Sequence, residues 1–137
     1  MSTLTRGAPA ATIALRAAIS VTLVVSGLIH AELYVHGYRS VPTIGPAFLA
    51  QASAFVALSI LIAVGGPRWL QWAAGLGALG SLVAFALSRT VGIFGFIEHS
   101  WQPAPQALVS VLAEVLTVVL CAVAVFTARG RTAARHF

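Results

Sequence analysis

Charged side chains are scarce in this 137-residue chain, and lysine is absent altogether. Only 8% of the residues are charged, whereas an average soluble domain has roughly a quarter. Because 59% of the residues are hydrophobic, the chain has too little polar surface to cover a soluble core. These proportions argue against an ordinary soluble domain and predict a single-domain integral membrane protein.

Other absences narrow the chemistry. The only cysteine is Cys121, which excludes an intrachain disulfide, a CxxC redox pair and a cysteine metal knuckle. Neither GxSxG nor HExxH nor a phosphate-binding glycine loop occurs. The net charge is +5, but the arginines are scattered and not interleaved with aromatic residues, which argues against a nucleic-acid partner. The sequence therefore favours a non-enzymatic component of the membrane.

Four apolar segments are each long enough to cross about 30 Å of hydrocarbon as a helix. They cover residues 13–34, 47–64, 70–88 and 107–127, and the third has an apolar extension to residue 97. Segments rich in Gly and Pro separate them: GYRSVPTIGP, GGPR and EHSWQPAP. The first segment is longer than the apolar region of a typical cleaved signal peptide. We therefore expect an all-α, four-helix transmembrane bundle that spans residues 1–137 as one domain.

The positions of the arginines predict the orientation of this bundle. Six of the eight fall on one side of the predicted membrane: Arg6, Arg16, Arg68, Arg129, Arg131 and Arg135. Only Arg39 and Arg89 belong to the other side. By the positive-inside rule, both termini are cytoplasmic and the chain is a multi-pass protein of the cell membrane.

Polar side chains gather in the outer half of the predicted bundle. All three acids, Glu32, Glu98 and Glu114, fall there, as do three of the four histidines. Counted at about 1.5 Å per residue, His30, Gln51 and Glu114 lie roughly 5–10 Å below the outer surface. An ionisable group at that depth costs at least about 2.5 kcal/mol against lipid unless it is paired. The sequence therefore predicts one polar layer to which every helix contributes.

Within this layer we expect a ligand or proton site, whose candidate residues are His30, Tyr34, Gln51, Arg89 and Glu114. Arg89 and Glu114 are the expected intramembrane salt bridge, because one bidentate contact neutralises both charges. That pairing favours a third helix that continues past Arg89. If Gly92 or Gly95 ends the helix, Arg89 lies at the interface instead.

The spacing in the first helix sorts its polar groups into two faces. His30 and Tyr34 are four residues apart and share one face, while Glu32 and His36 share another. We expect the first pair to face the interior and the second pair to reach water. The loop GIFGFIEHSWQP, with its apolar residues between glycines, is expected to cover the polar layer as a lid.

Several functions are compatible with these groups. The network could be purely structural and fix helix register. It could line the cavity of an accessory subunit or small-ligand binder, with Arg89 holding an anionic or quinone-like headgroup. His36, Glu98 and His99 could form a metal site, or two histidines could ligate a b-type haem. Proton-coupled transport is a further alternative, with His30 and Glu114 as the relay.

Small residues recur every four positions along the third segment. Two such series are present: Ala73, Gly77 and Ser81, and Gly80, Ala84 and Ser88. Faces of this kind let helix backbones approach closely inside a bilayer. We therefore expect the third helix to be central, and a homo-oligomer or a partner membrane protein to bind through this face.

Overall fold

A computed structural model describes residues 7–134 of the chain. Within that range it contains four helices and one π-helical turn: α1 Gly7–Leu33, η1 Tyr34–Tyr38, α2 Ile44–Ala63, α3 Trp69–Ser88 and α4 Gln106–Ala133. All four helices are long and apolar enough to cross a membrane, as the sequence predicts. The described residues form no strand beyond an isolated bridge between Ile93 and Phe96. The all-helical part of the prediction is therefore confirmed.

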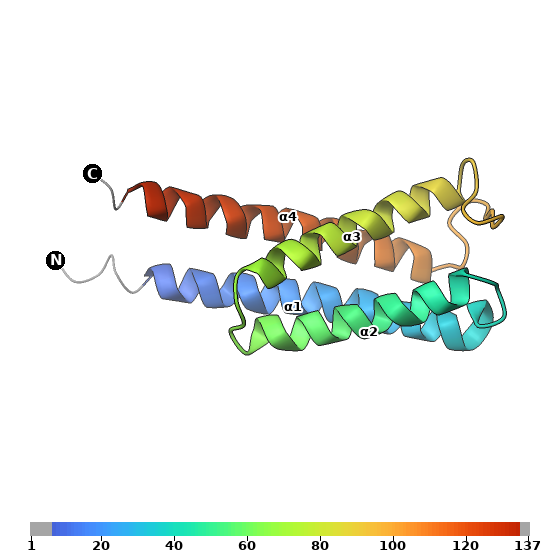
Figure 1. Cartoon of the computed structure of the whole chain (residues 1–137), viewed down its shortest axis with the longest axis horizontal. Helices are drawn as coiled ribbons and strands as arrows, with labels where there is room; N and C mark the ends of the chain where they lie inside the picture. Colours follow the sequence, from blue (N-terminus) through green and yellow to red (C-terminus); the bar gives the residue numbers. More distant parts are fainter. Residues whose placement is uncertain (1–6, 135–137) are drawn as a thin grey trace.

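The four helices lie side by side and give the bundle two ends (Figure 1). The terminal end comprises the start of α1, the α2–α3 turn at residues 64–68 and the end of α4. The distal end comprises residues 34–43 and the α3–α4 loop at residues 89–105. Helices that follow one another in the chain run in opposite directions, because each connection joins two helices at the same end of the bundle.

The helices are not equivalent in their packing. α1 packs along both α2 and α4, and α3 packs along α4 but touches α2 only sparsely. The order across the bundle is therefore α2–α1–α4–α3, with α1 and α4 in the middle. α3 has neighbours on two sides, as expected, but it is not the central helix, because its contact with α2 is sparse and α1 and α4 carry most of the packing.

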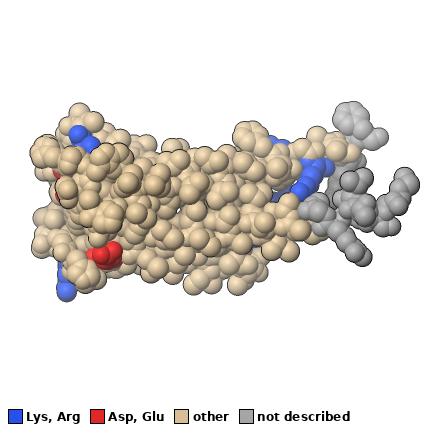
Figure 2. Space-filling view, turned by 180° about the vertical axis from the view of Figure 1, so that it is seen from behind, with Lys and Arg blue, Asp and Glu red and all other residues tan. Residues whose placement is uncertain are grey.

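The apolar core fills the half of the bundle nearer the terminal end. All four helices contribute to it: Ile19, Leu23, Phe55, Ile62, Leu70, Ala74, Ala78, Cys121 and Ala124. Large aliphatic side chains also point outward along every helix, for example Leu28, Ile60, Leu76 and Leu116. Figure 2 shows the result: the visible charged residues lie at the two ends, and the surface between the ends is uncharged.

The small residues of α3 are used inside the chain. A methyl group at Gly77 would lie 3.1 Å from Phe55 Cε1 of α2, and one at Gly75 would lie 3.1 Å from Cys121 Cβ of α4. By contrast, a methyl group at Gly80 would meet nothing within 4 Å. Close approach at Gly77 and Gly75 therefore serves packing within the bundle, and homo-oligomerisation stays a prediction.

α3 ends at Ser88, so the apolar extension to residue 97 is not helical. The chain turns at Gly92, where φ is +86° and where a methyl group would lie 2.8 Å from Ile97 Cγ1. A residue with a side chain would be strained there, whereas glycine adopts this conformation freely. The turn folds residues 93–97 back over the distal end of the bundle and leaves Arg89 just after the helix.

Candidate functional site

The centre of the polar layer is Glu114 of α4, which is 1% exposed. Its Oε1 atom accepts hydrogen bonds from Ser26 Oγ at 2.9 Å and from Ser81 Oγ at 2.8 Å. It also accepts from Ser110 Oγ and from Gln51 Nε2, each at 3.1 Å. These donors come from α1, α3, α4 and α2 respectively, so one carboxylate oxygen joins all four helices.

His30 of α1 lies beside this carboxylate and is buried. Its Nδ1 atom is 2.9 Å from the carbonyl oxygen of Ser26. A carbonyl only accepts, so Nδ1 carries the hydrogen and donates. The Nε2 atom is 3.9 Å from Glu114 Oε1, which is too long for a hydrogen bond. In the neutral ring, Nε2 is therefore an acceptor placed next to another acceptor.

A partly enclosed cavity of about 240 Å³ opens from this layer toward the distal end. His30, Gln51, Ser81, Ser110 and Glu114 form its floor. Aromatic residues dominate its walls: Tyr38, Phe48, Phe85, Phe94 and Phe96. The Phe48 ring packs against two neighbouring rings: its centre lies 5.0 Å from the centre of the His30 ring and 4.9 Å from the centre of the Tyr38 ring.

The hydrogen-bond donors of the floor are already used. Gln51 Nε2 has two hydrogens, and it donates to both Ser81 Oγ, at 2.7 Å, and Glu114 Oε1. The hydroxyls of Ser81 and Ser110 donate to Glu114 in turn. What the floor can still offer is acceptors: the Glu114 carboxylate, His30 Nε2 and the Gln51 amide oxygen. Such a floor suits a donor or a cation.

The expected salt bridge between Arg89 and Glu114 does not form among residues 7–134. Arg89 instead pairs with Glu98, with Nη1 3.5 Å from Oε2. Its Nε donates to the Ser100 carbonyl at 2.9 Å and its Nη2 to the Gln102 carbonyl at 2.6 Å. Because α3 ends at Ser88, Arg89 lies just after the helix and its guanidinium packs against the α3–α4 loop instead of reaching Glu114. Because all three nitrogens have partners, Arg89 is poorly placed to hold an anionic headgroup.

The α3–α4 loop covers the cavity, in the position expected for a lid. Ile93, Phe94 and Phe96 from this loop line the cavity wall. Tyr38 holds the loop from the side of α1 by donating to Glu98 Oε2 at 2.7 Å. Arg89, Glu98 and Tyr38 therefore form a polar rim around an aromatic cavity.

The first helix divides its polar groups largely as expected. His30 is buried, whereas Glu32 and His36 are exposed. Tyr34 is only half-buried and does not line the cavity, and Tyr38 takes that place. The π-helical turn begins at Tyr34: Arg39 N donates to the Tyr34 carbonyl five residues earlier, at 3.0 Å, which widens the turn and re-aims the side chains that follow, including Tyr38.

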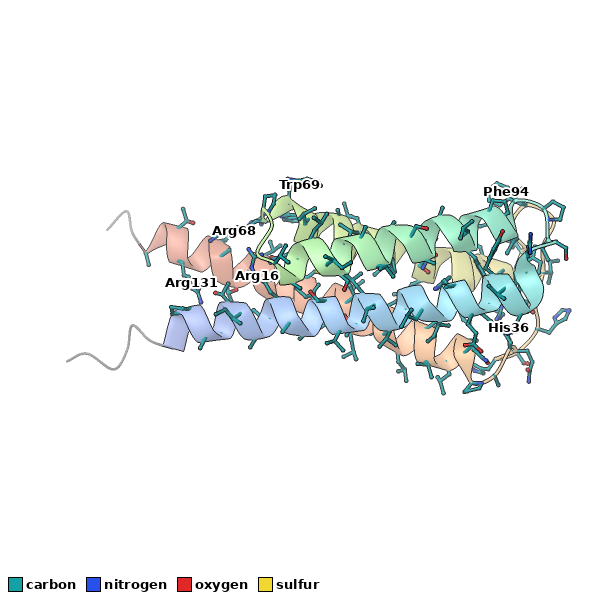
Figure 3. The ribbon with its side chains drawn as sticks, turned by 90° about the horizontal axis from the view of Figure 1, so that it is seen from below. Arg16, His36, Arg68, Trp69, Phe94 and Arg131 are labelled. Carbon is teal, nitrogen blue, oxygen red and sulfur yellow. The ribbon has the colours of Figure 1, made fainter. Side chains whose placement is uncertain are left out.

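The three residues considered for a metal site are not brought together. His36 is exposed, with its Nδ1 3.0 Å from the Glu32 carbonyl oxygen. Glu98 is held by Tyr38 and Arg89, and His99 is exposed in the loop. Within residues 7–134 there is no group of three or more His, Cys, Asp or Glu placed to share a metal ion. Figure 3 shows His36 directed away from the bundle.

The sequence interpretation missed the serines that surround Glu114. Ser26 lies four residues before His30 and Ser110 lies four residues before Glu114, so both share a helix face with an ionisable group. That spacing could have identified them. Ser81 carried no comparable signal, because it was indistinguishable from the other small residues of its series.

Comparisons of the chain with protein-family models, curated proteins and solved structures found no match. The chemistry of the cavity is nevertheless specific. It combines a buried carboxylate, an acceptor imidazole nitrogen 3.9 Å away and aromatic walls. This arrangement can bind a hydrogen-bond donor and stabilise a positive charge.

Proposed function

We propose that this chain is a non-enzymatic, multi-pass protein of the cell membrane that binds a small organic amine in its distal cavity. The observation that carries the proposal is the state of the floor. Its hydrogen-bond donors are consumed internally, and Glu114, Gln51 and the neutral His30 ring retain only accepting capacity. A protonated amine has up to three donors and no acceptor, so it complements this floor.

The walls support the same ligand. The faces of aromatic rings attract cations, and such contacts strengthen when they are shielded from water. Phe48, Phe85 and Phe96 line the cavity together with Tyr38. An anionic ligand would instead meet the Glu114 carboxylate, and the guanidinium that lines the cavity, Arg89, already binds Glu98 and two loop carbonyls through its three nitrogens.

The size of the cavity limits the ligand to a small molecule. A dry engineered cavity of about 150 Å³ holds benzene, and drug-sized ligands usually occupy about 300–1,000 Å³. At about 240 Å³, the distal cavity fits one ring or a branched alkyl group with a short amine substituent.

Binding is favoured over transport by what lies below the layer. Thr117 donates to Thr22 at 2.8 Å, and most of the buried residues around and below this pair are apolar, such as Ile19, Leu23 and Ala78. A proton or ion relay through His30 and Glu114 would therefore meet a largely apolar region before it reached the terminal end. The cavity is suited to holding a ligand that enters from the distal side.

We also propose that the terminal end faces the cytoplasm and that the four helices cross the bilayer. Arg16, Arg68 and Arg131 lie at the terminal end (Figure 3), in accord with the positive-inside rule. Introduced cysteines at Ser40 and Thr132 test this orientation. A membrane-impermeant thiol reagent added outside should label position 40 and leave position 132 unlabelled; labelling of both from one side would refute the topology.

Three probes of nearly equal size test the ligand class: benzylamine, benzyl alcohol and benzoate. Benzylamine should raise the unfolding temperature of the purified protein in detergent, benzyl alcohol should raise it less, and benzoate should have no effect. Glu114→Gln should remove the preference for benzylamine over benzyl alcohol, because the charge is lost while an accepting oxygen remains.

A cavity-filling variant tests whether benzylamine stabilises the protein by occupying the cavity or only through its charge. Ala84 lines the cavity without a polar role, so Ala84→Leu should abolish stabilisation by benzylamine. Ala57→Leu adds the same volume at an exposed position on α2 and should leave the response unchanged. The proposal fails if benzoate stabilises as well as benzylamine, or if Ala84→Leu responds like the wild type.

A further inference from the structure

The terminal end carries positive charge with no carboxylate side chain near it. Arg16, Arg68, Arg129 and Arg131 lie there, whereas the three acids of the chain, Glu32, Glu98 and Glu114, all lie in the distal half. Figure 2 shows blue without red at this end. This imbalance makes the terminal end a candidate site for an anion.

The four arginines are not all free to bind one. Arg16 Nη1 donates to the Gly66 carbonyl at 2.9 Å and to the Ile62 carbonyl at 3.3 Å, which holds the α2–α3 turn. Arg131 Nη1 donates to Thr12 Oγ1 at 3.1 Å. Arg68 and Arg129, in contrast, are exposed and have no side-chain hydrogen bond or ion pair within residues 7–134. These two arginines therefore have the most donors to offer.

An unpartnered amide on a largely buried side chain beside Arg68 points independently to a ligand. Gln71 is 8% exposed as a whole, and its side-chain amide makes no hydrogen bond within residues 7–134. The amide atoms are not among the fully buried ones, so they remain accessible to a group from outside the chain. Gln71 lines a groove of about 470 Å³ together with Arg68, Trp72, Arg129 and Thr132. Its amide is thus placed to donate to a group in that groove.

The start of α3 adds to the attraction for an anion. Gln71 is the third residue of α3, and the N-cap residue Arg68 makes no side-chain capping hydrogen bond. The partial positive charge at this helix end is therefore not offset by an acidic or hydroxyl cap. Across the groove, the Arg129 guanidinium lies 5.8 Å from the centre of the Trp72 ring, which holds a second positive charge in place.

The groove continues into an apolar one along α3 and α4. This second groove, of about 230 Å³, shares Gln71, Trp72, Val125 and Arg129 with the first. It then extends toward the middle of the bundle between apolar residues: Gly75, Leu76, Leu79, Val118, Cys121, Ala122 and Phe126. A charged groove that leads into an apolar groove along two helices has the shape of a lipid, with headgroup and acyl chain in sequence.

We propose that this surface binds one anionic phospholipid, with its phosphate at Arg68, Gln71 and Arg129 and one acyl chain along the apolar groove. Arg68 and Arg129 supply the positive charge and the Gln71 amide supplies a hydrogen bond to a phosphate oxygen. A free phosphate ester would use the charged groove alone and leave the apolar groove empty. The site is separate from the distal cavity and does not depend on amine binding there.

Native mass spectrometry of the full chain in detergent tests the proposal by counting retained lipids. Phosphatidylglycerol should be retained in preference to phosphatidylcholine of the same acyl chains. Arg68→Gln and Gln71→Leu should each reduce the retained phosphatidylglycerol, by about fivefold for the arginine, which is the effect of one basic residue near an anionic headgroup. Thermal unfolding of both variants checks that they are folded.

A matched variant separates a specific site from general charge. Arg39 is an exposed arginine at the distal end, so Arg39→Gln removes the same charge without touching the groove. Its retention of phosphatidylglycerol should equal that of the wild type. Equal losses in Arg39→Gln and Arg68→Gln, or an unchanged affinity in Arg68→Gln, would overturn the proposal.

Competition by soluble anions distinguishes a lipid from a phosphate ester. Glycerol 3-phosphate and inorganic phosphate lack acyl chains and should displace phosphatidylglycerol only at large excess. If either displaces the lipid at equal concentration, the apolar groove contributes nothing and the lipid assignment is wrong. If Gln71→Leu retains lipid like the wild type, the amide is not a ligand and the assignment is wrong as well.

Discussion

The two ends of the bundle manage charge in opposite ways. In the distal half, Glu114 is enclosed by four donors from the protein itself, and Glu98 is matched by Arg89. At the terminal end, Arg68 and Arg129 lie in an open groove and have no carboxylate partner within residues 7–134. The distal half therefore has its polar groups satisfied internally apart from a few acceptors, whereas the terminal end depends on its surroundings for counter-charges. In our proposals, the first arrangement binds a small donor and the second binds an anionic phospholipid.

At each end, one arginine side chain also holds a turn by hydrogen bonds to its carbonyls. The two arginines differ in whether a carboxylate balances their charge. Arg89 binds the Ser100 and Gln102 carbonyls and has Glu98 as counter-ion. Arg16 binds the Gly66 and Ile62 carbonyls, and its positive charge has no side-chain partner of opposite sign within residues 7–134. A comparison of substitutions at the two ends should therefore separate the effect of charge pairing from that of hydrogen bonding to a turn.

The largest loss of unfolding free energy is expected from a substitution of Glu114. Glu114→Leu leaves the buried hydroxyls of Ser26 and Ser110 and the amide of Gln51 without their acceptor. The loss of unfolding free energy should be at least about 3 kcal/mol, because one buried donor without an acceptor already costs about 1–3 kcal/mol. Thermal and denaturant unfolding in detergent measure it. Glu32→Gln changes an exposed acid at the same end and should stay close to wild type; similar losses in both variants would contradict the buried layer.

An intermediate loss of unfolding free energy is expected from substitutions in the polar rim of Arg89, Glu98 and Tyr38. In a double-mutant cycle, Arg89→Met and Glu98→Gln should show a coupling of about 1–2 kcal/mol, because each removes the partner of the other. Arg89→Met combined with Glu114→Gln should instead be additive within about 0.5 kcal/mol, since the two residues share no partner. Coupling to Glu114 and not to Glu98 would restore the pairing that the sequence suggested and refute the rim.

The smallest effect is expected at the terminal end. Arg16→Gln removes two hydrogen bonds to turn carbonyls but strands no buried counter-ion, so the cost should be about 1 kcal/mol. Hydrogen exchange should increase locally, at the backbone amides of residues 64–68, without an increase across the bundle. Arg39→Gln is the control. A loss in Arg16→Gln as large as that in Arg89→Met would show that charge pairing is not what distinguishes the two ends.

The helices could be predicted from the sequence because their signals are local. Each apolar segment is bounded by Gly and Pro, and the expected bounds differ from the observed ones by a few residues: 47–64 was expected for Ile44–Ala63 and 70–88 for Trp69–Ser88. The larger differences, at the start of α1 and the end of α4, are polar or weakly apolar extensions of a helix that hydropathy alone does not detect. That Gln51 and Glu114 lie at the same level of the bundle followed from counting residues along these helices.

The partners of the polar groups could not be predicted in the same way. The pairing of Arg89 depends on the path of the α3–α4 loop, which is set by positive φ angles at Gly92, Phe94 and Gly95. Periodicity placed Tyr34 on the face of His30, but it gave no sign of the π-helical turn Tyr34–Tyr38, which brings Tyr38 to the cavity wall. Both differences arise where the chain leaves standard helical geometry.

The sparse contact between α2 and α3 has a consequence for assembly. The chain consists of two helical hairpins, α1–α2 and α3–α4, that meet mainly through α1 and α4. Each hairpin is continuous in sequence, so we expect each to insert into the bilayer before the two dock. Glu114 is then on one hairpin, while Ser26 and Gln51 are on the other. In a bilayer, the carboxylate would lack half of its donors until docking, so we expect the polar layer to favour the joining of the two hairpins.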